Sequence, residues 1–475
     1  MNFFDVLLAR KLGGGGNGGI TPSGTLEILE NGAFDVTNYA SAFVSVPTDG
    51  VSASELIVKT ISSYIGSESF VGAFAFYGCQ DLRYVEFPNA SFIDPSAFNN
   101  CASLSQISMP NVEYIANYAF AGNSLLEYAD FPSCNSIGEY AFAGAGISYA
   151  NIPRLNDIPY GAFQYCSNLL SLDFQYVVSV GSYAAMSCSK LETVNLPQAS
   201  YIGATAFSDC IKLSYISAPL LEKVYEYTFY NCRSLKSAIF PSVTGINNMA
   251  FLDNLSLETA SFPLASYVNQ NAFKGCIMLS NISFPMVSNI YAYAFQSCGF
   301  SVAYFPEASF VYDFAFSDCQ SLIEASLPKV INLGSGAFYK CSNLAKVSFP
   351  STLISFKVST FESCFALTDV YAPNIQYVGS SAFKNCSALS VLSFPSAVSF
   401  YNSAFQNCGN LMSLYLLGSS YCRIAAPLVF AGTPISSSNA SGIYGSIYVP
   451  SSMFETYKAS ITWSIFSSRF VAYTE

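Results

Sequence analysis

The chain has 475 residues, of which 52% are hydrophobic and 10% charged, so it can bury a large core and lacks the composition of a disordered protein. Its net charge of −11 includes no basic block, and it has no long apolar run, so we expect neither nucleic-acid binding nor membrane insertion. The absence of histidine removes every Ser-His, Cys-His and His-metal arrangement, so we expect no enzyme, no cofactor and no metal site.

The first twenty residues combine a short apolar segment with a glycine-rich stretch. The segment "MNFFDVLLARKL" fits a short amphipathic helix, and residues 13–19 would then form a flexible tether. The apolar run is broken by Asp5 and is followed by Arg10 and Lys11, which is not the order of a secretory signal. We therefore predict an attachment segment in residues 1–20 of a protein made in the host cytoplasm, with a disordered start as the alternative.

Residues 21–50 have the pattern of a small β-hairpin module. The stretch "GTLEILENGAFDVTNYASAFVSVP" alternates apolar and polar residues on both sides of the turn-forming Asn31 and Gly32. It resembles a segment of tail-associated and other structural proteins of phages and prophages of Gram-positive gut bacteria. The resemblance implies a virion location and contact with virion tail proteins through residues 1–50.

A short phrase then returns along most of the chain, as in "NAFKGCIMLSNISFP" and "SAFKNCSALSVLSFP". The phenylalanine of its "AF" recurs every 22 residues, with two gaps of 21 and one of 23, which is the period of a leucine-rich solenoid. The sixteen anchor positions are Phe76, Phe98, Phe120, Phe142, Phe163, Ala185, Phe207, Phe229, Phe251, Phe273, Phe295, Phe316, Phe338, Phe361, Phe383 and Phe405.

Each copy reads L-x-x-V-x-F-P and then A-F-x-x-C, which predicts one short strand and one return. In the copy that begins at Leu279, the alternation of Leu279, Ile282 and Phe284 fits a strand, and Pro285 ends it because proline cannot donate to a ladder. The A-F-x-x-C part is short enough for a single helical turn or a tight loop. Stacked copies would merge their apolar positions into one core, so we predict a parallel β-solenoid of about 16 coils.

The motif AFxxCxxLxxVxFP resembles the BspA-type leucine-rich repeat of bacterial, protist and phage-encoded surface proteins. The resemblance covers roughly residues 70–418 and implies surface attachment and ligand recognition, with no catalytic residues to carry over. We assign residues 51–72 to an N-terminal cap, 73–418 to the repeats and 419–475 to a C-terminal cap. The last of these should contain a helix near residues 451–465, with Trp463 in the cap core.

Thirteen of the fifteen cysteines occupy one slot of the repeat, three residues after the anchor. Cys134 and Cys422 lie outside the slot, and Asn123 and Asn254 fill it in two copies. Cytoplasmic synthesis and the absence of a C-x-x-C pair favour small, buried, reduced thiols over redox or metal roles. The slot cysteines are Cys79, Cys101, Cys166, Cys188, Cys210, Cys232, Cys276, Cys298, Cys319, Cys341, Cys364, Cys386 and Cys408.

The two residues that flank the central aliphatic residue of each strand should point out of the sheet. These positions are rich in tyrosine, serine and asparagine, which make adaptable recognition surfaces. The alternative is that serine only makes the exposed face of the sheet hydrophilic. Tyrosines beside hydrogen-bond acceptors suit a glycan. Glycosidase chemistry by the carboxylates is disfavoured, because an open sheet has nothing to close over a substrate. The candidate ligand-binding residues are Tyr84, Glu86, Tyr128, Asp130, Tyr149, Asn151, Asp173 and Tyr215.

The leading hypothesis is a phage- or prophage-encoded protein of the virion that binds a host-surface glycan or protein through the solenoid sheet. A structural spacer or decoration protein without a specific ligand is one alternative. A bacterial surface adhesin is the other, and it would place the chain on a bacterial cell surface.

Overall fold

The computed structural model describes residues 27–28, 33–35, 62–436, 442 and 444–474. The predicted attachment segment, residues 1–20, and the first half of the predicted N-terminal cap, residues 51–61, lie outside the described residues. The fold is a parallel β-solenoid of about 18 turns, close to the number of coils predicted. It divides into two compact units, unit 1 (Met1–Tyr176) and unit 2 (Val177–Glu475).

Each turn of unit 1 contributes a three-residue strand to one sheet face and a two-residue strand to another. At its start, β1 (Glu27–Ile28) pairs antiparallel with β2 (Ala33–Asp35), and β2 pairs in parallel with β3 (Ser63–Ile65). The three-residue strands that follow are β5 (Tyr84–Glu86), β7 (Gln106–Ser108), β9 (Tyr128–Asp130), β11 (Tyr149–Asn151) and β13 (Ser171–Asp173). The two-residue strands are β4 (Phe70–Val71), β6 (Phe92–Ile93), β8 (Tyr114–Ile115), β10 (Ser136–Ile137) and β12 (Asp157–Ile158).

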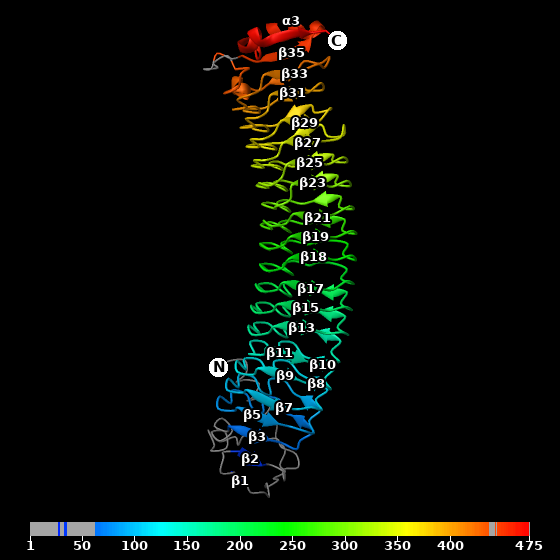
Figure 1. Ribbon diagram of the computed structural model, residues 1–475, viewed down its shortest axis with the longest axis vertical. Helices are drawn as coiled ribbons and strands as arrows, with labels where there is room; N and C mark the ends of the chain where they lie inside the picture. Colours follow the sequence, from blue (N-terminus) through cyan, green and yellow to red (C-terminus); the bar gives the residue numbers. More distant parts are fainter. Residues whose placement is uncertain (1–26, 29–32, 36–61, 437–441, 443, 475) are drawn as a thin grey trace, which may run out of the picture. The chain divides into compact units, whose positions relative to one another are not determined.

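Unit 2 repeats this arrangement, and Figure 1 shows its strands following one another turn by turn. Its three-residue strands are β15 (Thr193–Asn195), β17 (Tyr215–Ser217), β18 (Ser237–Ile239), β19 (Thr259–Ser261), β21 (Asn281–Ser283), β23 (Val302–Tyr304), β25 (Glu324–Ser326), β27 (Lys346–Ser348), β29 (Asp369–Tyr371), β31 (Val391–Ser393) and β33 (Ser413–Tyr415). Its two-residue strands are β14 (Ser179–Val180), β16 (Tyr201–Ile202), β20 (Tyr267–Val268), β22 (Asn289–Ile290), β24 (Phe310–Val311), β26 (Asn332–Leu333), β28 (Ser355–Phe356), β30 (Tyr377–Val378), β32 (Ser399–Phe400) and β34 (Arg423–Ile424).

The anchor phenylalanines form columns of stacked rings inside each unit. In unit 1 the rings of Phe98 and Phe120 have centroids 5.2 Å apart and planes 5° apart. In unit 2 the rings of Phe273 and Phe295 are 5.4 Å and 3° apart. These separations are close to the spacing of neighbouring parallel strands, about 4.8 Å, so each ring stacks on the ring of the next turn, except at Ala185, which has no ring. This packing explains why the sequence motif repeats at a nearly constant spacing.

The A-F-x-x-C segment is a tight turn. The residues two before and two after the anchor adopt positive φ, for example Tyr118 (φ 59°) and Gly122 (φ 77°) around Phe120. This conformation suits glycine and is unfavourable for a tyrosine. It is supported by hydrogen bonds between turns, since the N–H of Tyr118 donates to the carbonyl of Glu139 at 3.0 Å. The turns therefore carry a backbone ladder of their own.

All fifteen cysteines are free and buried, in agreement with the prediction. The slot thiols act as hydrogen-bond donors: Cys298 Sγ donates to the anchor carbonyl of Phe273 at 3.1 Å. Asn254, which replaces cysteine in one turn, donates from Nδ2 to the equivalent carbonyl of Phe229 at 2.8 Å. The slot thus selects a small side chain that can satisfy the buried carbonyl of the preceding turn.

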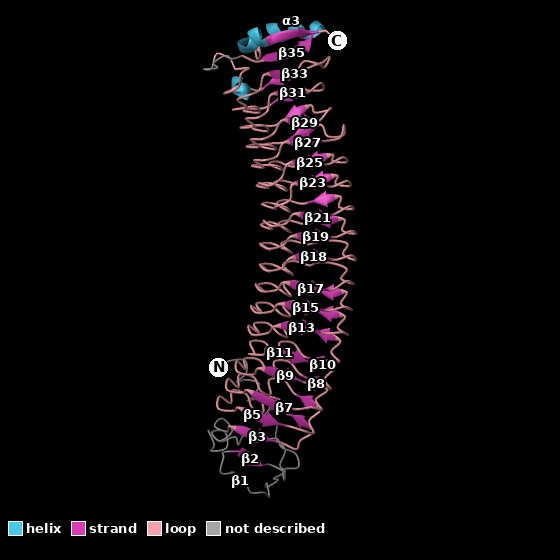
Figure 2. Cartoon of the chain, viewed as in Figure 1, coloured by secondary structure: helices cyan, strands magenta, loops and turns pink. Residues whose placement is uncertain are grey.

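Helices lie at the C-terminal end of unit 2, as Figure 2 shows. The predicted helix over residues 451–465 is wrong in its extent, because the chain is extended at Ser460. A continuous helix would place Tyr457 and Trp463 about 120° apart around its axis. The interruption lets both side chains pack in the cap, where they are fully buried, and the prediction that Trp463 belongs to the cap core is confirmed. The elements here are η1 (Pro427–Phe430), β35 (Ser446–Pro450), η2 (Ser451–Met453), α3 (Phe454–Ala459), η3 (Ser464–Arg469) and β36 (Phe470–Tyr473).

Candidate functional site

The outward columns of the three-residue strands lie where the repeat pattern predicts them, because their side chains are exposed or half-buried. In unit 1, β9 and β11 pair in parallel with Tyr128 opposite Tyr149 and Asp130 opposite Asn151. The two tyrosines are 56% and 51% exposed, so about half of each side chain is open to a ligand. Four of the predicted residues therefore form one small surface on two adjacent strands, here called the tyrosine face.

The polar half of the tyrosine face is held in place by a hydrogen bond. Asn151 Nδ2 donates to Asp130 Oδ1 at 2.7 Å, which leaves the second carboxylate oxygen of Asp130 available as an acceptor. Beside Tyr128, a hydrogen bond to the Glu127 carboxylate and its negative charge raise the pKa of the phenol. The phenol of Tyr128 therefore stays neutral at physiological pH, and its ring presents flat apolar surface beside carboxylates.

Tyr84 and Glu86 satisfy one another on β5. The Tyr84 hydroxyl donates to Glu86 Oε2 at 2.6 Å, and this bond, together with partial burial and the carboxylate charge, raises the pKa of Tyr84 to about 12. Strand β7, which carries Gln106 in the tyrosine column, pairs with β5 and contacts β9. The structure thus places this pair on the same face, two strands from Tyr128.

The remaining two candidates differ in position. Asp173 lies on β13, which contacts β11, and accepts a hydrogen bond from Gln175 Nε2 at 2.7 Å. Tyr215 belongs to unit 2, where β17 pairs with β15 and the ring is 52% exposed opposite Thr193.

A second aromatic row was not anticipated. Phe70, Phe92 and Tyr114 face each other in register on β4, β6 and β8, and the rings of Phe92 and Tyr114 have centroids 4.8 Å apart. The signal was present in the repeat, because each of these residues immediately precedes a buried aliphatic residue at the 22-residue period. The L-x-x-V-x-F-P pattern by itself predicts only the sheet of three-residue strands.

Within the described ranges, no group of three or more His, Cys, Asp and Glu side chains is placed to hold a metal ion. The helices in the part of the chain that the structure describes are too short or too polar to cross a bilayer.

Each repeat contributes one short strand with the L-x-x-V-x-F pattern and one tight turn, which is the architecture of a leucine-rich repeat solenoid. The chain belongs to the BspA-type family of such proteins. The family model "BspA type Leucine rich repeat region (6 copies)" matches residues 58–170, 178–302 and 309–424. Proteins of this family are typically found at the cell surface, and leucine-rich repeat solenoids are typically non-enzymatic scaffolds that bind proteins or other ligands. No curated protein matches the sequence.

The chain is also similar to several solved leucine-rich repeat proteins. A leucine-rich repeat protein from Bacteroides ovatus is 22% identical, with 85% of this chain and 87% of that one covered and a TM-score of 0.43. A leucine rich cell surface protein from Faecalibacterium prausnitzii is 22% identical, with 74% and 82% covered and a TM-score of 0.34. The leucine-rich repeat protein of T. pallidum is 30% identical over 32% of this chain and 77% of that one, with a TM-score of 0.30.

Proposed function

We propose that this chain is a non-enzymatic recognition protein that binds a host-surface glycan or protein through the tyrosine face of unit 1. The observation that carries the proposal is the pair of half-exposed rings, Tyr128 and Tyr149, held side by side on paired strands next to Asp130 and Asn151. Tyrosine gives a large contact area at low entropic cost, and neighbouring polar groups add directed hydrogen bonds. The open sheet offers a ligand contact area without a cavity that could exclude water from a reaction.

The rigidity of the sheet supports this role. Both tyrosines lie on strands whose backbones are hydrogen-bonded to the neighbouring turn, and Ala129 between the columns is buried in the core. A ligand therefore meets a face whose backbone is already ordered, and binding loses little conformational entropy.

The experiment is a binding assay of the labelled full-length chain on whole host cells. Tyr128→Ala combined with Tyr149→Ala should abolish binding while leaving the melting curve unchanged, because the truncated rings are at hot-spot positions worth about 2 kcal/mol or more each. Ser261→Ala combined with Ser283→Ala, on β19 and β21 of unit 2, is the matched control and should bind as the parent does. If both double variants bind like the parent, the spacer without a specific ligand is the better description.

We further propose that a phage or prophage encodes the chain and that it is carried on the virion. The support is the likeness of residues 21–50 to phage tail-associated proteins. A bacterial surface adhesin is the second candidate, favoured by the typical location of the family. Gold-labelled antibody against the solenoid distinguishes them: label on purified particles supports the virion, and label confined to the bacterial envelope supports the adhesin.

A further inference from the structure

The charges are divided unevenly between the two units. Residues 62–176 of unit 1 contain ten acidic residues, two arginines and no lysine, whereas residues 177–475 contain fourteen acidic and fourteen basic residues. The described part of unit 1 therefore carries a large excess of negative charge, and unit 2 is balanced. The acidic residues of this part of unit 1 are Glu68, Asp81, Glu86, Asp94, Glu113, Glu127, Asp130, Glu139, Asp157 and Asp173.

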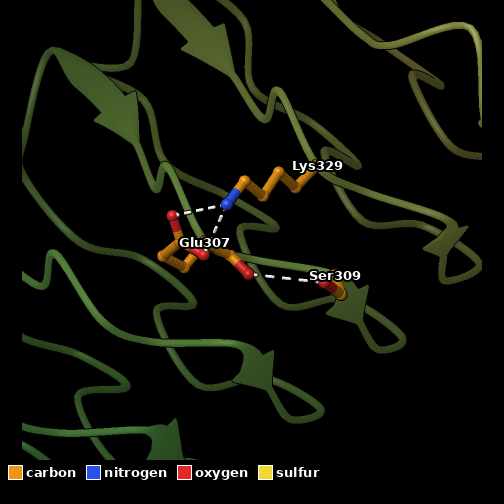
Figure 3. Close-up of polar contacts among 3 residues, drawn as sticks. All are labelled: Glu307, Ser309 and Lys329. Carbon is orange, nitrogen blue, oxygen red and sulfur yellow. Dashed lines mark hydrogen bonds and ion pairs between the residues drawn. The ribbon is translucent and has the colours of Figure 1, made fainter.

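The fold itself does not require this excess, because unit 2 neutralises carboxylates with lysines on the neighbouring turn. Figure 3 shows Lys329, whose Nζ lies 2.7 Å from both carboxylate oxygens of Glu307, with Ser309 close by. On the paired strands β25 and β27, Lys346 Nζ lies 3.4 Å from Glu324 Oε1. A lysine can therefore occupy an outward column of this repeat opposite a carboxylate.

The same outward columns are filled differently in unit 1. Glu324 and Lys346 take the column position that Tyr128 and Tyr149 take on β9 and β11. Unit 1 thus places rings where unit 2 places an ion pair, and it keeps carboxylates in the adjacent column at Glu86, Asp130 and Asp173. The face combines exposed aromatic surface with the excess of negative charge of the described part of unit 1.

Elsewhere in the chain, cations lie over aromatic rings of this kind. The guanidinium of Arg469 is 3.7 Å from the centroid of the Tyr444 ring, and Lys274 Nζ is 5.6 Å from that of Tyr293. Such contacts are attractive because the face of the ring is electron-rich. An arginine placed over an exposed tyrosine beside a carboxylate gains both a stacking contact and a charge-assisted hydrogen bond.

We infer that the ligand of the tyrosine face is a basic, arginine- or lysine-bearing segment of a protein. This inference rests on the proposed function and names its ligand class. The cationic side chains lie over Tyr128 and Tyr149 and reach Asp130, Asp173 adds negative charge on the neighbouring strand, and the negative field of unit 1 steers the segment to the face. A neutral glycan would gain nothing from the excess charge, and an anionic one would be repelled.

The test measures fluorescence anisotropy of a labelled peptide of alternating arginine and glycine titrated with the full-length chain. Peptides that alternate glutamate or serine with glycine are the charge controls. We expect binding of the arginine peptide alone, weakened about tenfold or more between about 50 and 200 mM NaCl. Asp130→Asn with Asp173→Asn should weaken it about tenfold, since each removes a charge beside the rings. Glu324→Gln with Asp369→Asn removes the same charge from unit 2 and should change it less than about twofold.

Equal weakening by the two double variants would mean general attraction to an acidic protein and would overturn the inference, as would tight binding of the serine peptide. Whole-cell binding separates this failure from failure of the proposed function. If Tyr128→Ala with Tyr149→Ala abolishes host-cell binding while Asp130→Asn with Asp173→Asn and added salt leave it intact, the face binds a neutral glycan. If none of these changes lowers host-cell binding, the proposed function itself fails.

Discussion

Replacing Asn123 with cysteine should stabilise unit 1. Asn123 fills the cysteine slot of its turn, is fully buried, and has no hydrogen-bond partner for either amide atom among the described residues. In the preceding turn, Cys101 Sγ donates to the carbonyl of Phe76 at 2.9 Å. The substitution Asn123→Cys removes the unpaired amide and offers a thiol to the equivalent carbonyl of Phe98.

The size of the effect follows from these contacts. An unsatisfied buried polar group costs about 1–3 kcal/mol, and the slightly smaller thiol leaves only a small void, so the net gain should be about 1–2 kcal/mol. Because neighbouring turns stabilise one another locally, the gain should appear as amide hydrogen exchange slowed about 5- to 30-fold in peptides spanning residues 98–147. Mass spectrometry of the native full-length chain measures this directly.

Asn254→Cys is the matched control. Asn254 Nδ2 already donates to Phe229 at 2.8 Å, and only its Oδ1 lacks a partner among the described residues, so this substitution removes one unpaired atom instead of two and should change local exchange less. The reasoning is refuted if Asn123→Cys leaves exchange in its own turn unchanged or faster, or if the two substitutions have equal effects.

Three further predictions concern side chains with defined partners. The fifteen cysteines should resist alkylation in the native chain and react after unfolding, because burial raises the pKa of thiols such as Cys298; several cysteine–cysteine crosslinks found without prior reduction would contradict this. The pKa of Tyr84 measured by NMR should be about 12, and Glu86→Gln should lower it toward 10. Because the pKa of Tyr84 is raised in the folded state, the hydrogen bond between Tyr84 and Glu86 stabilises the fold fully below pH 10, and this contribution is lost as the pH rises toward 12. Trp463→Phe should lower the free energy of unfolding by about 1–3 kcal/mol in urea titrations, because it leaves the buried Cys422 carbonyl without the 2.8 Å bond from the indole N–H.

The repeat architecture could be predicted because one constraint governs it. Rings that recur every 22 residues, as at Phe98 and Phe120, can stack at strand spacing only if each copy makes one turn of a solenoid. The period of the repeat therefore predicts the fold. The reason for the cysteine slot could not be predicted, because the carbonyl that accepts from Cys298 belongs to the preceding turn. The interrupted cap helix was also missed, since it depends on where Trp463 meets the last turn of the core.

The candidate site was predictable in part. Strand alternation correctly pointed Tyr128 and Tyr149 outward, and the pairing of β9 with β11 brought Asp130 and Asn151 beside them. The role of the face as a binding surface remains a proposal.

The central claim, that unit 1 binds the host surface through its tyrosine face, is tested most directly by hydrogen exchange of the full-length chain with and without host cell-envelope fragments. The account predicts slower exchange on binding in peptides that cover β9 and β11, and unchanged exchange in peptides that cover β19 and β21. Protection confined to the strands of unit 2, or no protection in a mixture where the chain is shown to be bound, would contradict it.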